Sequence, residues 1–92
     1  MVQIRQKVDD IKQENEKTAD GEYEKLVKQM KGYREQKGVS LTALSVKTQT
    51  YASYIQRVEN ARINTSVKKL IVLLDALGLE LVIRKKEERL EE

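Results

Sequence analysis

Apolar side chains recur every three or four residues in several separate segments of this chain, and glycines or short polar stretches divide the segments. This spacing places the apolar side chains on one face of a helix. The clearest stripe contains Tyr23, Leu26, Val27, Met30 and Tyr33. The chain contains no proline. Every residue after the first therefore has a backbone amide that can donate a helical hydrogen bond. The pattern predicts an all-α fold of four to five helices.

The first two helices of this pattern are expected at 21–37 and 41–48. Gly38 stands where a left-handed C-terminal cap belongs, directly after the first stripe. Ser40 is a favourable N-cap for the second helix, whose inward residue is Leu44.

Two more helices are expected after the polar turn at 48–50. The first covers about 51–60, with Ile55 and Val58 directed inward. A loop at 61–65 follows, and Asn64 or Thr65 is expected to cap the last helix. Gly78 closes that helix, whose apolar set is Val67, Leu70, Ile71, Leu73, Leu74 and Leu77.

The two ends of the chain lie outside this helical pattern. Residues 1–20 are expected to form an amphipathic, helical N-terminal arm on the spacing of Ile4, Val8 and Ile11, although an extended segment also fits. The expected organisation is therefore an arm at 1–20, a domain at 21–79, and a dimerisation strand with a charged tail at 80–92.

The strand prediction rests on an alternation with period two after Gly78. Leu79, Leu81 and Ile83 alternate with Glu80, Val82 and Arg84, which is typical of a strand. A lone strand exposes unpaired backbone groups. The same strand of a second copy would satisfy them in antiparallel pairing about a twofold axis. The alternative is a continuation of the last helix into the tail.

Charge is concentrated in the central domain. Residues 21–79 carry ten basic and five acidic side chains, and 36–58 contain no acidic residue at all. Such a stretch can approach a polyanion without repulsion. A solvated basic face is the alternative.

Composition excludes several classes of site. The chain has no Cys and no His, so disulfides, thiolate or imidazole metal sites and His-based acid–base catalysis are all excluded. No glycine-rich phosphate loop occurs. We expect neither an enzyme nor a bound cofactor or metal, and no membrane segment, because no long apolar run is present.

The helices at 41–48 and 51–60 have the spacing of a helix-turn-helix unit, whose second helix enters the major groove of DNA. Around them, residues 26–79 resemble the Cro/repressor-type (XRE) helix-turn-helix family. The matching positions are Arg34, Gly38-Val39-Ser40, Leu44-Ser45, Ile55, Val58-Glu59-Asn60, Asn64-Thr65-Ser66 and Asp75-Ala76-Leu77-Gly78. The resemblance implies a lambda-repressor-like helix-turn-helix domain, with the C-terminal β-strand pairing across a dimer.

Three positions depart from the family pattern. Leu41 stands where a phosphate-binding Gln is frequent, which puts that contact in doubt. Gln49 replaces the glycine of the turn, and it can adopt the left-handed backbone at a cost of about 1 kcal/mol. Ala61 likewise replaces a frequent glycine after the recognition helix.

The resemblance implies roles for individual residues. Base-reading positions are Tyr51, Ala52, Ser53, Tyr54, Gln56 and Arg57, and Arg57 would bond bidentately to guanine. Phosphate-binding positions are Ser40, Lys47, Thr50, Asn60, Arg62 and Lys68. Arg34 and Glu59 would form a structural ion pair, and Leu79, Leu81, Val82 and Ile83 would mediate dimerisation. The alternatives are a solvated Arg57, tyrosines that cover the core edge, and an Asn60 that only caps its helix.

The implied function is sequence-specific repression of transcription by a homodimer on a palindromic operator in double-stranded DNA. The strand after the last helix is similar to that of HipB-type antitoxins, which autoregulate an operon and bind a kinase-like toxin. This implies a toxin partner, a kinase-like one in preference to a ribonuclease, and a bacterial cytoplasmic location at the nucleoid. The alternatives are a HigA-type antitoxin, a phage or host regulator without a toxin, and a protein-binding module that has lost DNA readout.

Overall fold

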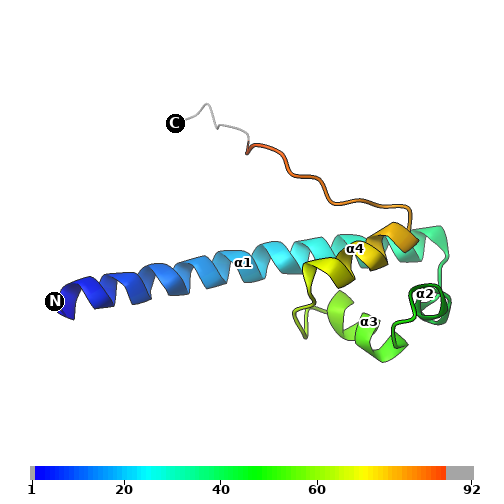
Figure 1. The fold of residues 1–92 in the computed structure, drawn as a ribbon, viewed down its shortest axis with the longest axis horizontal. Helices are drawn as coiled ribbons and strands as arrows, with labels where there is room; N and C mark the ends of the chain where they lie inside the picture. Colours follow the sequence, from blue (N-terminus) through cyan, green and yellow to red (C-terminus); the bar gives the residue numbers. More distant parts are fainter. Residues whose placement is uncertain (1, 87–92) are drawn as a thin grey trace.

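The computed structural model describes residues 2–86, with side chains from residue 7 onward. This part of the chain contains four helices and no strand (Figure 1). They are α1 (Val2–Lys37), α2 (Leu41–Thr48), α3 (Ala52–Glu59) and α4 (Val67–Ala76). None of them combines the length and the apolar character that a membrane crossing requires.

α1 is a single unbroken helix of 36 residues. We expected an arm at 1–20 and a separate helix from residue 21, but the helix continues through Gly21. A glycine lowers helix propensity without removing a hydrogen-bond donor, so the ladder is not interrupted there. The N-terminal half of α1 projects beyond the other helices (Figure 1).

The core lies between the C-terminal half of α1 and the three short helices. α3 packs against α1 and α2, and α2 packs against α4. The buried apolar residues are Val27, Met30, Leu44, Ile55, Val58, Leu70, Leu73, Leu74 and Leu77. Each belongs to a stripe that the spacing predicted, so amphipathic burial directs all four helices to one centre.

Serine side chains cap two of the helices. The hydroxyl oxygen of Ser40 accepts a hydrogen bond from the amide of Ala43 at 3.0 Å and begins α2. Ser66 does the same for α4 through the amide of Lys69, also at 3.0 Å. The expectation that Asn64 or Thr65 caps α4 was therefore wrong. Thr65 is engaged elsewhere, since its amide donates to the Tyr23 hydroxyl at 3.1 Å.

After Gly78 the chain leaves the domain as an extended segment, residues 79–86. No strand forms in this segment, and no backbone hydrogen bond involves residues 80–86 in the described chain. A ladder needs a second strand, and the described part of this single chain offers none. Leu79 packs against the core, whereas Ile83 is fully exposed. The charged tail from residue 87 onward lies outside the described residues.

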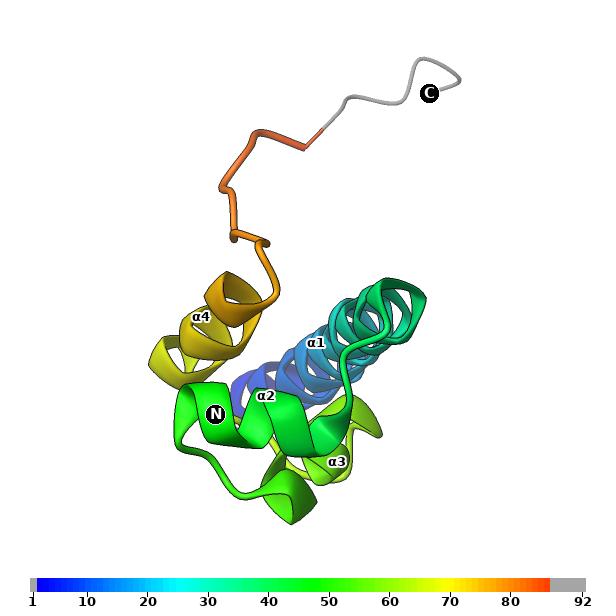
Figure 2. The same cartoon turned by 90° about the vertical axis from the view of Figure 1, so that its right-hand side faces the viewer.

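The extended segment and α3 lie on opposite sides of the molecule. Figure 1 and Figure 2 both show α3 on one side of α1 and α4 and the extended segment on the other. A contact made by the segment therefore leaves the outer face of α3 uncovered.

Candidate nucleic-acid interface

α2, a tight turn and α3 form the unit that presents the candidate interface. Gln49 adopts the left-handed conformation at the C-cap of α2, with φ 54° and ψ 42°. The amide of Thr50 then donates to the Ser45 carbonyl at 3.1 Å. Ala61 is also left-handed, with φ 56°, directly after α3. Both glycine replacements thus adopt the backbone that a glycine would favour.

The outer face of α3 is open to solvent. Tyr51 is 84% exposed at its N-cap, and Ser53, Gln56 and Arg57 are exposed along the helix. Ala52 is half-buried. These base-reading candidates therefore lie together on one accessible surface.

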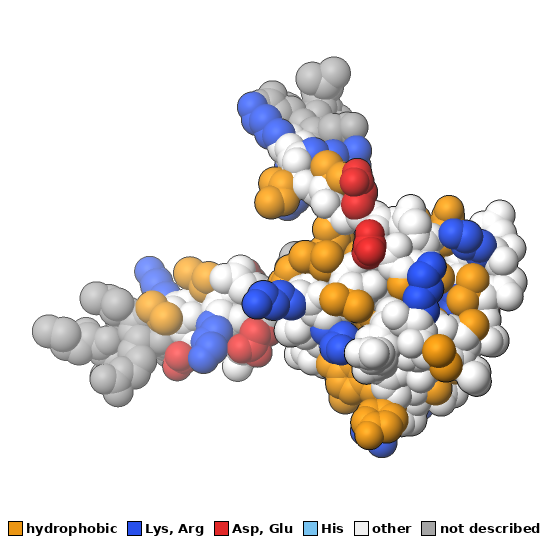
Figure 3. Space-filling view, turned by 45° about the vertical axis from the view of Figure 1, so that its right-hand side comes forward, with side chains coloured by type: hydrophobic (Ala, Val, Ile, Leu, Met, Phe, Trp, Pro, Cys, Tyr) orange, Lys and Arg blue, Asp and Glu red, His pale blue; other side chains and the backbone are white. Residues whose placement is uncertain are grey.

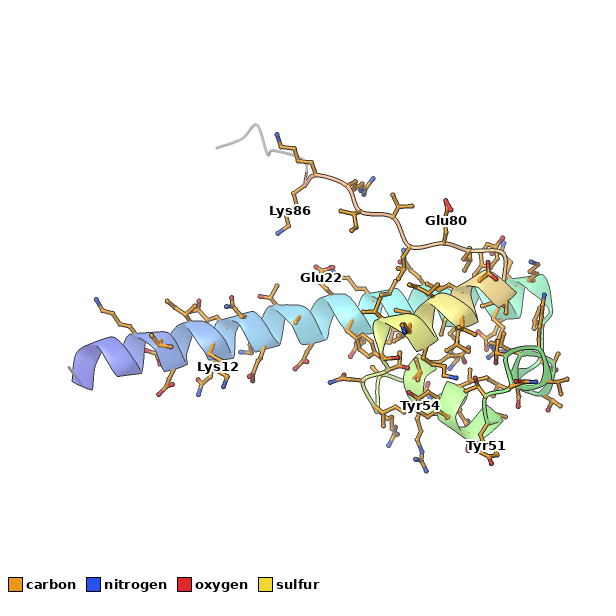
Figure 4. The ribbon with its side chains drawn as sticks, viewed as in Figure 1. Lys12, Glu22, Tyr51, Tyr54, Glu80 and Lys86 are labelled. Carbon is orange, nitrogen blue, oxygen red and sulfur yellow. The ribbon has the colours of Figure 1, made fainter. Side chains whose placement is uncertain are left out.

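Tyr54 differs from the other candidates on α3. Its ring packs against the core, and its hydroxyl forms a hydrogen bond of 2.8 Å with that of Thr65. Figure 4 shows Tyr51 and Tyr54 at α3, on the side of the molecule opposite Glu80 and Lys86. Tyr54 therefore ties α3 to the following loop, as the alternative of a core-edge role anticipated.

A buried ion pair holds α3 against α1. The Nε atom of Arg34 donates to one Glu59 carboxylate oxygen at 2.7 Å, and its Nη2 donates to the other at 3.0 Å. The side chains are 8% and 1% exposed. Arg34 also donates to the Val39 carbonyl at 2.8 Å. One guanidinium thus joins α1, the loop before α2 and the end of α3.

The Glu59 carboxylate, mainly through this hydrogen bond, raises the pKa of Arg34 above its ordinary value although burial opposes the rise. Arg34 therefore remains charged wherever the protein is folded near neutral pH. The bidentate geometry also fixes the relative orientation of the two helices.

Five of the six phosphate-binding candidates are exposed, and the side chains of four of them donate to no backbone carbonyl of the described chain. Ser40, Asn60, Arg62 and Lys68 are exposed. Asn60 ends α3 and accepts a hydrogen bond from Lys31 of α1 at 3.3 Å. Ser40 precedes α2, Asn60 and Arg62 follow α3, and Lys68 lies in the first turn of α4.

The other two phosphate candidates, Thr50 and Lys47, form hydrogen bonds within the protein. Thr50 is only 7% exposed, and its hydroxyl donates to the Thr48 carbonyl and accepts from Lys69 Nζ at 3.0 Å. Lys47 donates to the Ala76 carbonyl at the end of α4, at 3.1 Å. A turn threonine satisfies the backbone locally, and a lysine near a helix C-terminus is attracted to its free carbonyls. The burial of Thr50 argues against its phosphate role, whereas the phosphate role of the exposed Lys47 stays a prediction.

Two basic residues at the interface were missed from sequence. Lys69 bridges α4 to the turn through Thr50, and Lys31 lies beside Asn60. Lys31 precedes Arg34 by one helical turn, so the assignment of Arg34 to the α3 side of α1 could have identified it. Lys69 offered no comparable signal.

Acidic side chains are sparse around this surface. Residues 36–58 contain none, and Glu59 is buried and paired with Arg34. On the face drawn in Figure 3, acidic groups lie along the arm and near the extended segment, while the lower part of the globular body shows basic groups and no acidic one. The surface can therefore approach a polyanion.

Comparison with known proteins agrees with this geometry. A family model described as a helix-turn-helix domain matches residues 25–84, which is most of the chain. No curated protein matches the chain, and no solved structure does. The match covers α2, the turn, α3, α4 and residues 25–37 of α1. The chain therefore belongs to the helix-turn-helix domain family, whose fold suggests a DNA-binding regulator.

Proposed function

We propose that this protein is a repressor of the Cro/repressor (XRE) type that binds a palindromic operator as a homodimer and catalyses no reaction. The observation that carries the proposal is the solvent-exposed face of α3, which the buried Arg34–Glu59 pair orients. Such a helix, packed on a short preceding one, fits the major groove.

In this proposal Arg57 provides the main base contact and Ser53 and Gln56 provide weaker ones. Arg57 is exposed, and the acidic residue of α3, Glu59, is buried and paired with Arg34. A guanidinium presents two donors at the spacing of guanine O6 and N7. Ala52 and the Tyr51 ring are suited to the methyl group of thymine.

The test is a titration of operator DNA, selected from random duplexes, against the variant Arg57→Ala. We expect a loss of specific affinity of roughly 5- to 150-fold, the range that one bidentate contact provides. Lys12→Ala is the matched control, because it removes one exposed positive charge from the arm. If no sequence is enriched from the random duplexes and Arg57→Ala leaves the affinity for DNA unchanged, DNA readout is contradicted. Such a result would favour a protein-binding module.

That second function has a specific observation in its favour. Lys47 and Thr50, two of the expected phosphate ligands, bond within the protein, and Leu41 stands at the place of a third. A binding module would show no salt-dependent association with duplex DNA. The acid-free surface around α3 favours the repressor.

For the homodimer we propose that the segment from Leu79 to Lys85 pairs with its copy as an antiparallel strand. The support is the free backbone of residues 80–86 and the fully exposed side chain of Ile83. We expect Ile83→Glu to convert the dimer into a folded monomer, measured by sedimentation and circular dichroism. A dimer unaffected by this change would contradict strand pairing.

We further propose a HipB-like antitoxin role, with a kinase-like toxin as the partner and a bacterial cytoplasmic, nucleoid-associated location. The support is the resemblance of the segment after α4. The alternatives are a HigA-type antitoxin and a regulator without a toxin. Co-expression with the protein encoded beside it distinguishes them, because only an antitoxin suppresses the growth defect that its neighbour causes.

A further inference from the structure

The N-terminal arm exposes an apolar stripe that its own chain does not cover. Val8 is 58% exposed and Ile11 is 57% exposed, and both lie on the part of α1 that projects from the domain (Figure 1). Most of the stability of a helix in a protein comes from packing of its amphipathic face. Burial of the stripe against another surface would stabilise it.

The stripe continues along α1 into the domain. At intervals of three or four residues the same face contains the apolar residues Val8, Ile11, Ala19, Leu26 and Tyr33, with the polar residues Asn15, Glu22 and Gln29 between them. Its domain end lines a groove of about 560 Å³ between α1, α4 and the extended segment. The apolar side chains in that groove are Leu26, Met30, Tyr33, Leu74, Leu79 and Leu81.

We propose that the arm of a second copy of this chain fills the groove, so that the two α1 helices lie antiparallel and each arm covers the other copy. This deepens the proposed homodimer and rests on it. The registry follows from the stripe. About a point between Asp20 and Gly21, Val8 is placed opposite Tyr33 and Asn15 opposite Leu26. Ile11 is placed opposite Met30, whose side chain is 1% exposed, and therefore packs over Gln29 and Tyr33. The apolar tip of each arm then meets the apolar groove of its partner.

The extended segment indicates the same axis independently. Val82 and Arg84 lie beside Glu22, Lys25 and Leu26 of α1, and Val82 is the middle of the proposed strand. Figure 1 shows the segment running back in the direction opposite to α1. A twofold axis that pairs two such strands antiparallel passes close to the centre of the stripe, so one axis serves both contacts.

The arrangement also suits a palindromic DNA site. α3 contacts α1 near Lys31 and Arg34, which are about 10 to 14 residues from the proposed centre. At 1.5 Å per residue, the two α3 helices would lie roughly 30–40 Å apart, which brackets the 34 Å between successive major grooves on one face of DNA. Since α3 lies opposite the extended segment (Figure 2), both copies of α3 remain uncovered.

The first test measures the dimer dissociation constant of Val8→Glu/Ile11→Glu by sedimentation of the full chain. We expect at least a tenfold weaker dimer, roughly the effect of burying unpaired carboxylates. Both side chains are exposed in the single chain, so the domain stays folded. Gln13→Glu/Lys17→Gln is the matched control, because it changes the net charge equally on the opposite face of the arm.

A cross-linking test fixes the registry. The chain contains no cysteine, so Val8→Cys/Tyr33→Cys introduces the only thiols. Within one copy these positions lie about 37 Å apart on a continuous helix, far beyond the roughly 6 Å of a disulfide. We expect an oxidised covalent dimer. The control Gln13→Cys/Lys28→Cys places its two cysteines symmetrically about the same point of α1, but on the opposite face of the helix. It should form no covalent dimer and should therefore run as a monomer under denaturing conditions.

Three outcomes would overturn the inference without affecting the proposed function. In the first, Ile83→Glu dissociates the dimer but Val8→Glu/Ile11→Glu leaves its dissociation constant unchanged. The stripe would then bind a different protein. Another is efficient cross-linking of Val8→Cys alone, which indicates parallel arms. The third is equal cross-linking of the two double-cysteine variants. If Ile83→Glu and the arm variant both leave the dimer intact, both proposals fail.

Discussion

The buried pair of Arg34 and Glu59 is the residue-level feature on which the candidate interface depends. Its two hydrogen bonds, at 2.7 and 3.0 Å, lie where neither side chain is more than 8% exposed. Removal of one partner from such a site leaves an uncompensated charge in a low-dielectric surrounding. The pair therefore contributes more to the orientation of α3 against α1 than to the free energy of unfolding.

We predict that Glu59→Ala lowers the free energy of unfolding by about 3–5 kcal/mol, measured by urea denaturation. The double variant Arg34→Met/Glu59→Leu should lose less, since it leaves no buried charge unpaired. Lys28→Ala, which breaks the exposed pair of Lys28 with Glu24, should change stability by less than about 1 kcal/mol. Equal losses in all three variants would show that burial of the pair is unimportant.

Gln49 is the second residue with a distinct energetic signature, because a side chain with a β-carbon occupies the left-handed region there. We predict that Gln49→Gly raises the free energy of unfolding by up to about 1 kcal/mol. Gln56→Gly, inside α3, should lower it by about the same amount. Thermal unfolding of the two variants provides the comparison, and a loss of stability in Gln49→Gly would argue against strain at this turn.

At the level of elements, two glycines near the C-terminal end of α1 have opposite backbone requirements. Gly32 lies within the helix, whereas Gly38 follows it with φ 78°. A β-carbon at either position meets no atom within 4 Å. Only the backbone conformation distinguishes the two sites.

We therefore predict opposite signs for the same substitution. Gly32→Ala should raise the free energy of unfolding of the domain by about 0.5–1 kcal/mol, through helix propensity. Gly38→Ala should lower it by about 1–2 kcal/mol, because alanine disfavours the left-handed cap. Calorimetry on a monomeric background such as Ile83→Glu separates these effects from dimerisation. A matching sign for both variants would be evidence against this account.

At the level of the whole molecule, charge is distributed so that the α3 side attracts polyanions. Residues 21–79 carry the excess of basic side chains, and Arg62 and Lys68 are exposed beside α3. Contacts of this kind release counterions from DNA and make affinity fall with salt. Contacts to bases change sequence preference instead.

We predict that Arg62→Ala and Lys68→Ala each make the affinity for DNA less dependent on salt. The slope of log affinity against log salt concentration should become less steep by about one for each half-site of the dimer, whatever the sequence of the duplex. Arg57→Ala should relax the preference among sequences at one base pair. Affinities at four salt concentrations, with operator and scrambled duplexes, test both statements. An unchanged slope for Arg62→Ala and Lys68→Ala would remove them from the phosphate-binding set.

Sequence by itself determined the features that depend on local chemistry. Helical spacing located α2, α3, α4 and the domain half of α1, and inward residues such as Ile55 and Leu73 form the core. Ser40, Gly38 and Gly78 mark helix ends because capping requires only a nearby amide or a positive φ. The pairing of Arg34 with Glu59 was expected from the resemblance to the XRE pattern, because spacing along one helix gives no partner on another.

Tertiary structure decided whatever depends on which groups meet in space. It joined the arm to α1, since Gly21 weakens a helix without breaking it. It moved the cap of α4 to Ser66, because contacts with Tyr23 and Tyr54 engage Thr65. It also buried Thr50, engaged the exposed Lys47 with the end of α4, and brought Lys31 and Lys69 to the interface. A helical period specifies a face, whereas the hydrogen-bond partners on that face are set only when distant segments pack together.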